Sequence, residues 1–162
     1  MYVDAYKLAA DALAERASED RGEIDALIYP LVHLYRHHLE LALKTLIVIG
    51  REYAEEPRPD FAHHKLGILW RDARRYMQMF SAVPDPEHLD AMGELLSELD
   101  QLDPASFAFR YPVTKNGGAV LSDVRRINVR HFAETAGRMS RFLDDYMVAM
   151  DLKLDMKQEH WG

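Results

Sequence analysis

The spacing of apolar residues in the segment from about residue 23 to 49 constrains the fold most strongly. Apolar side chains recur there every three or four positions, which places them on one side of a helix at 100° per residue: Ile24, Leu27, Ile28, Leu31, Leu34, Tyr35, Leu39, Ala42, Leu46 and Ile49. The opposite side collects polar residues: His33, Arg36, His37, Glu40 and Lys44. This pattern predicts one long amphipathic helix.

The same period, interrupted by Pro and Gly, indicates further helices along the chain. We expect helices over about 3–18, 23–49, 61–80, 86–102 and 122–150. The fold class predicted from these segments is all-α. Residues 1–162 are expected to form a single domain, a bundle of four to five helices with one long irregular loop over about 103–120.

Local signals set the predicted ends of these helices. Gly50 follows the long helix where a C-cap glycine is expected. Asp60 and Ser122 are suited to cap the starts of the third and last helices, and Pro86 suits the first turn of the fourth. The segment 103–120 contains Asp-Pro, Tyr-Pro and Asn-Gly-Gly, which are typical of turns.

The composition excludes several classes of protein. The 162 residues include no cysteine, which excludes disulfide scaffolds, thiolate zinc sites and cysteine nucleophiles. No apolar run is long enough to span a bilayer, and the first residues do not form a secretion signal, so we expect a cytoplasmic protein without a membrane partner. The net charge of −7 argues against a uniformly basic nucleic-acid binder.

The polar side of the 23–49 helix has two interpretations. It can be a solvated face with ion pairs four residues apart, Arg36 with Glu40 and Glu40 with Lys44. Alternatively, His33, His37 and Glu40 can converge on a metal ion, with His63 or His64 as a fourth ligand. His38 falls on the apolar side instead, where a histidine is either a hydrogen-bonded core residue or a reactive group.

Three segments carry a family resemblance. They are Tyr-Arg-His-His-Leu-Glu-Leu-Ala-Leu-Lys at 35–44, His-Lys-Leu-Gly-Ile-Leu-Trp at 64–70, and Phe-Ala-Phe-Arg-Tyr-Pro at 107–112 ahead of the long last helix. This arrangement resembles the HEPN superfamily, the nucleotide-binding helical bundles of higher eukaryotes and prokaryotes, and in particular uncharacterised bacterial HEPN-like proteins. The likeness covers roughly residues 24–150.

The resemblance implies a helical bundle that commonly forms a homodimer. Many members of the superfamily are metal-independent ribonucleases of toxin–antitoxin or phage-defence systems, and others are non-catalytic binding modules. Catalytic members carry an Arg-x4–6-His motif. The matches here are Arg126 with His131, Arg125 with His131, and Arg58 with His63 or His64. Ile127 departs from the polar residue that the family prefers after the Arg.

The chemistry of such a site needs an Arg that holds a phosphate and a His that moves a proton. Five arginines lie between Ser122 and Phe142 against two acids, a local balance of 5 − 2 = +3, so an acidic total does not exclude RNA there. Residues that can support phosphate binding are, in chain order, Arg36, His37, His38, Arg110, Arg125 and Arg130.

We therefore expect a HEPN-like binding or accessory module with RNA, a nucleotide or a protein as partner and no cofactor. The resemblance implies that this module forms a homodimer. The first alternative is a metal-independent endoribonuclease with Arg126 and His131 as its catalytic pair. The second is a metal-binding helical bundle that uses His33, His37 and Glu40.

Overall fold

The computed structural model describes residues 2–19, 24–80, 86–102 and 128–161. Within these ranges the chain forms five helices and no strand, which confirms the all-α prediction. The helices are α1 (Tyr2–Glu19), α2 (Ile24–Tyr53), α3 (Leu66–Phe80), α4 (Pro86–Leu102) and α5 (Val129–Trp161). The predicted loop at 103–120 lies outside the described residues.

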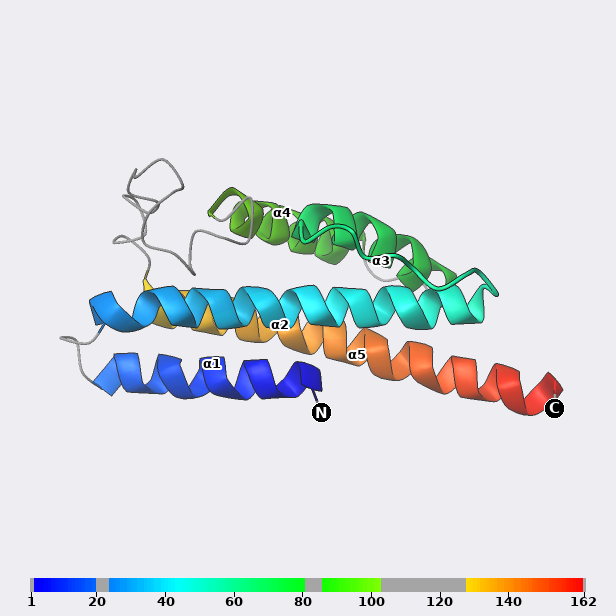
Figure 1. Ribbon diagram of the computed structural model, residues 1–162, viewed down its shortest axis with the longest axis horizontal. Coiled ribbons are helices and arrows are strands. Elements are labelled where there is room, and N and C mark those ends of the chain that lie inside the picture. Colours follow the sequence, from blue (N-terminus) through cyan, green and yellow to red (C-terminus); the bar gives the residue numbers. More distant parts are fainter. Residues whose placement is uncertain (1, 20–23, 81–85, 103–127, 162) are drawn as a thin grey trace.

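Helix α2 is the centre of the bundle and packs against α1, α3 and α5 (Figure 1). Figure 1 shows α1 along one side of α2 and the α3–α4 pair on the other, with α5 beside α2 and extending past its C-terminal end. The N-terminus of α1 lies near the middle of α5, so the C-terminal half of α5 extends beyond α1 (Figure 1). None of the described helices has a stretch long and apolar enough to cross a bilayer.

Two groups of buried apolar side chains hold these helices together. The larger lies among α2, α3, α4 and α5 and includes Leu43, Trp70, Leu96 and Leu143. The smaller joins α1 to the first half of α2 and the start of α5, and includes Tyr35. The apolar side predicted for α2 supplies residues to both groups, because that helix has neighbours on several sides.

The end of α2 differs from the prediction at Gly50. The helix continues through Gly50 to Tyr53, and Glu55 takes the left-handed conformation with a φ of 57°. The Glu56 N–H donates to the Arg51 carbonyl at 2.9 Å and the Glu55 N–H to the Glu52 carbonyl at 3.2 Å, which is a Schellman ending. Gly50 is instead required by packing, because a Cβ there would come within 3.0 Å of the Tyr76 side chain.

Two predicted helix starts also differ. Helix α3 begins at Leu66 rather than near residue 61, because Asp100 of α4, and not Asp60, accepts from the N–H groups at its start. Helix α5 begins at Val129, where the Asn128 side chain accepts from the His131 N–H at 3.1 Å. The expected cap at Ser122 lies outside the described residues.

Candidate functional site

The polar side of α2 is largely buried, so its interpretation as a solvated face is wrong. Arg36 and Glu40 are each 1% exposed. Both expected ion pairs are present: Arg36 Nη1 lies 3.4 Å from Glu40 Oε2, and Lys44 Nζ lies 2.7 Å from Glu40 Oε1. Periodicity could not reveal the burial, because the groups that cover this side come from α1, from α4 and from the segment before α3.

Glu40 is the centre of this buried cluster. Its Oε1 accepts hydrogen bonds from Lys44 Nζ at 2.7 Å and from His64 Nδ1 at 2.8 Å. Burial alone would raise the pKa of the Glu40 carboxyl, but the hydrogen bonds from Lys44 and His64 outweigh it and hold that pKa below its usual value. Glu40 is therefore an ionised carboxylate inside the protein.

Arg36 links α2 to the start of α3 and to α4. Its Nη2 donates to the His64 carbonyl at 2.9 Å and to Asp100 Oδ1 at 3.1 Å. Asp100 in turn accepts from the N–H groups of Leu66 and Gly67 at 3.0 and 2.8 Å. The structure thus brings together two of the three segments that carry the HEPN resemblance, and it commits the Arg36 guanidinium to internal partners rather than to a ligand.

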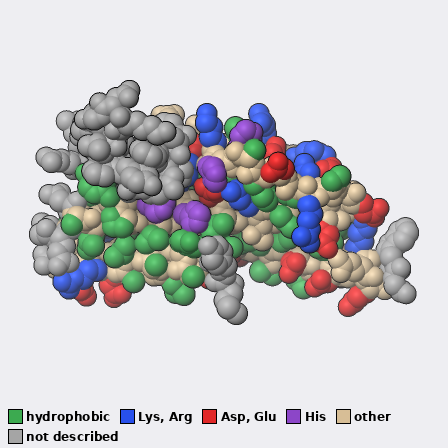
Figure 2. Space-filling view, viewed as in Figure 1, with side chains coloured by type: hydrophobic (Ala, Val, Ile, Leu, Met, Phe, Trp, Pro, Cys, Tyr) green, Lys and Arg blue, Asp and Glu red, His purple; other side chains and the backbone are tan. Residues whose placement is uncertain are grey.

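His64 presents an oriented imidazole at the surface. Its side chain is 63% exposed, and Nδ1 is held by the buried Glu40 carboxylate. Because a carboxylate only accepts, Nδ1 donates to Glu40, and Nε2 lies on the other side of the ring. Figure 2 shows histidine side chains gathered near the middle of this face of the molecule. The contact with Glu40 thus fixes the orientation of an exposed ring.

The histidines of α2 pack on each other rather than around a common metal position. The His33 and His37 rings are stacked at 6.1 Å, and Tyr6 of α1 meets the His37 ring edge-on at 4.4 Å. Burial lowers the pKa of His37. Among the described residues no group of three or more His, Asp or Glu side chains is arranged to hold a metal ion, so the set His33, His37 and Glu40 is not assembled.

His38 is a hydrogen-bonded core residue. It is 0% exposed, and its Nδ1 donates to the Val3 carbonyl at 3.0 Å. Its Nε2 lies 2.8 Å from the Ser140 hydroxyl, which is 3.3 Å from Asp144 Oδ2. His38 therefore joins α1, α2 and α5, which is the first of the two roles left open for it by its place on the apolar side of α2. At 0% exposure its side chain is not presented to a phosphate.

His131 lies at the first turn of α5 and is exposed. It lines a cavity of about 290 Å³ between α4 and α5, together with mainly apolar side chains and with Glu98 and Arg138. Its expected partners Arg126 and Arg125, and also Arg110, lie outside the described residues. The Arg126–His131 pair therefore stays a prediction.

Three exposed arginines share one face of α5: Arg130, Arg138 and Arg141, which we call the arginine face. Their spacing places them within about 80° around the helix axis and over about 16 Å along it. No ion pair joins any of the three to an acidic side chain of the described ranges, whereas Arg74 is paired with Asp90 and Arg75 with Glu56, both at 2.7 Å.

A shallow depression between α1 and α5 lies beside the arginine face. It is lined by residues of three helices: Lys7, Asp11, Ala14, Tyr35, Ala133, Glu134, Gly137, Arg138 and Arg141. Asp11 accepts from Tyr35 Oη at 2.6 Å and from Lys7 Nζ at 2.7 Å, so its charge is already engaged. Burial and the neighbouring Asp11 raise the pKa of Tyr35, which keeps its hydroxyl protonated. Arg138 and Arg141 line the depression together with the exposed Glu134, and no ion pair joins either arginine to an acid of the described residues.

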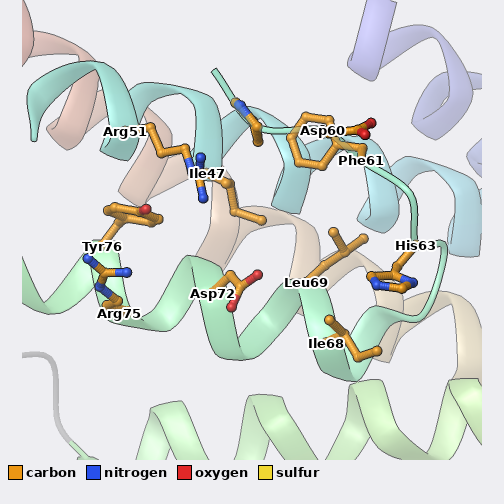
Figure 3. Close-up of a pocket in the computed structure, with 11 residues that line it drawn as sticks. Ile47, Arg51, Asp60, Phe61, His63, Ile68, Leu69, Asp72, Arg75 and Tyr76 are labelled. Carbon is orange, nitrogen blue, oxygen red and sulfur yellow. The ribbon is translucent and has the colours of Figure 1, made fainter. Parts of the chain in front are cut away.

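A smaller cavity of about 130 Å³ lies between the end of α2, the connection to α3 and α3 itself (Figure 3). Arg51 and Arg75 reach it, but both are held by Glu56, with atom separations of 3.9 and 2.7 Å. The Tyr76 hydroxyl donates to the same carboxylate at 2.6 Å. Because the cations are neutralised, this cavity is less suited to an anion than the depression beside α5.

The sequence analysis counted all three arginines of the arginine face in its basic stretch and named Arg130 as a phosphate-binding residue. It did not indicate the roles of Asp100 and His64 in the buried cluster around Glu40. Both residues act far from their own positions in the chain, so no local spacing indicates them. No protein-family model, curated protein or solved structure matches this chain, and the HEPN resemblance therefore rests on the three sequence segments alone.

Proposed function

We propose that this protein is a HEPN-like helical module that binds a phosphate-bearing polymer, single-stranded RNA in the first instance, on the arginine face of α5. The observation that carries the proposal is the grouping of three exposed arginines on one helix face. Arg130, Arg138 and Arg141 are exposed on one side of α5 without an acidic partner among the described residues. Arg36, Arg74 and Arg75 are paired with acids, and the exposed Arg58 and Arg71 lie outside α5.

Charge and shape on this face support binding of a flexible anionic chain. Guanidinium groups form paired hydrogen bonds with phosphate oxygens. The depression between α1 and α5 is open, and Gly137 leaves its α5 wall without a side chain. Contacts with two or three phosphates on a single strand predict that log K falls with log salt with a slope of about −2.

The test is binding of a labelled single-stranded RNA of about 20 nucleotides, followed by fluorescence anisotropy at several salt concentrations. The double variant Arg138→Glu/Arg141→Glu is expected to weaken binding about tenfold or more and to reduce the salt slope. The matched control is Lys65→Glu/Arg71→Glu, which makes the same change in net charge at exposed positions outside α5. Equal weakening by both double variants would contradict the proposal.

The endoribonuclease alternative is separated in the same experiment by following the length of the RNA. Cleavage that is lost in His131→Ala but retained when EDTA is added would replace the binding module with a metal-independent nuclease. His131 is exposed, so this substitution is expected to leave the fold intact.

The homodimer implied by the HEPN resemblance is a separate prediction, and light scattering measures it directly. A mass near twice the 18.7 kDa of the chain is expected. A mass near 18.7 kDa that does not change with concentration would contradict it.

A further inference from the structure

The outer side of the C-terminal half of α5 carries three large apolar side chains in contact with solvent. Val148, Leu152 and Met156 are 61%, 59% and 59% exposed. They are four residues apart, so they form a single row, which we call the apolar stripe, over about 12 Å of the helix. Because the N-terminal end of α1 lies near the middle of α5, the stripe lies where α5 extends beyond that neighbour (Figure 1).

The apolar stripe is surrounded by acidic side chains. Asp145, Asp151, Asp155 and Glu159 are all exposed, and on a regular helix they lie within about 100° of Leu152 around the axis. Figure 2 shows acidic and apolar side chains interleaved along this end of the molecule.

The two lysines of the same segment do not offset these acids on the outer side. Lys153 Nζ donates to the carbonyl of Phe80, the last residue of α3. Lys157 Nζ donates to the Tyr53 carbonyl and to Glu55 Oε1, both at 2.7 Å. Both ammonium groups thus face the rest of the bundle, and the outer side of this segment is apolar and negative.

We propose that the apolar stripe binds an amphipathic helix of a partner protein, one that has an apolar row flanked by Lys and Arg. Such a helix would bury the stripe and place a cation beside each of the exposed acids. A second copy of this chain is the less suitable occupant. Antiparallel pairing about Leu152 would bring Asp145 of one copy towards Glu159 of the other, which like charges disfavour.

The test uses a synthetic helical peptide of about 18 residues, or five turns, with a leucine row flanked by lysines. Its affinity for the full chain is measured by fluorescence anisotropy, beside a peptide in which every lysine is replaced by glutamate. The lysine peptide is expected to bind about tenfold more tightly than the glutamate peptide, and more weakly as salt increases.

Variants locate the binding surface. Leu152→Gln/Met156→Gln and Asp155→Lys/Glu159→Lys are each expected to weaken binding of the lysine peptide about tenfold. The controls are Leu8→Gln and Met79→Gln, at side chains that are 69% and 49% exposed on α1 and α3, and they are expected to leave it unchanged. All these positions are exposed, so circular dichroism should show an unaltered fold.

Three outcomes would overturn the proposal. The first is equal binding of the lysine and glutamate peptides. The second is unchanged binding of the lysine peptide in Leu152→Gln/Met156→Gln, which would make the attraction a general property of an acidic protein. The third is a dimer that dissociates in Leu152→Gln/Met156→Gln while the lysine peptide fails to bind, which would assign the stripe to a second copy. RNA binding by the arginine face is independent of all three.

Discussion

At the scale of single residues, side chains that are polar in the sequence are among the most important core residues. Arg36, Glu40 and His38 are at most 1% exposed, and each has a hydrogen-bond partner outside α2. Arg36 binds the His64 carbonyl and Asp100, Glu40 binds the His64 ring, and His38 binds the Val3 carbonyl and Ser140. The sequence pattern placed His38 on the apolar side of α2 correctly. It could not indicate that Arg36 and Glu40 are buried, because their covering groups come from residues 64 and 100.

Gly50 provides a prediction at this scale. In Gly50→Ala the new methyl group would lie within 3.0 Å of the Tyr76 side chain, which is 2% exposed and held through its hydroxyl by Glu56. We expect a loss of about 3 kcal/mol in the free energy of unfolding, measured with urea. Gly137→Ala is the control, because its nearest neighbour would be Arg141 Nη1 at 3.8 Å; there we expect a gain of up to about 1 kcal/mol. Similar effects at both sites would be inconsistent with the packing argument.

At the scale of helices, the ends are where the sequence and the structure differ. Within the described ranges, the five helices and the start and end of α4 agree with the prediction. The start of α3 does not agree, because its capping group is Asp100, 34 residues from Leu66 in the chain. Rules for helix ends use neighbouring residues, so they favoured Asp60 and could not consider a cap from another helix.

Asp100 provides the prediction at the scale of helices. Asp100→Ala removes the carboxylate that accepts from two N–H groups at the start of α3 and from the buried Arg36. We expect this substitution to lower the free energy of unfolding by about 3–5 kcal/mol. Asp90→Ala, on the same helix, is the control. It removes an ion pair with Arg74 in which the Asp90 side chain is 63% exposed, and it should lower the free energy of unfolding by less than about 1 kcal/mol. Equal midpoints in urea for the two variants would rule out the capping role.

At the scale of the whole molecule, the two halves of α5 differ in the charge of their exposed side chains. The first half has the arginine face, and the second has the apolar stripe among acids. The net charge of −7 is an average over both halves. It therefore excludes a uniformly basic surface but does not indicate where on the molecule an anion can bind. The sequence alone could locate the charges along the chain, but their exposure or pairing depends on the packing of the other helices.

The buried ionisable groups predict that acid destabilises the whole fold. The pKa of His37 is lowered in the folded chain, so the unfolded chain binds more protons and stability falls as the pH decreases below about 6.5. The pKa of Glu40 is also lowered, so its contribution is present above its usual value and is lost as the pH falls through the lower folded value. Urea unfolding between pH 7 and 3 measures both, and His37→Gln should remove the dependence above pH 5. If that variant retains the full slope, His37 is not its source.

The placement of the groups at the two ends of α3 has a consequence for how the protein opens. Asp100 of α4 holds the first N–H groups of α3, and Lys153 of α5 holds the carbonyl of its last residue. A helix normally frays from its ends, but both ends of α3 are secured by distant parts of the chain. Its amide protons should therefore exchange with solvent only when α4 or α5 detaches, which makes these three helices one cooperative unit.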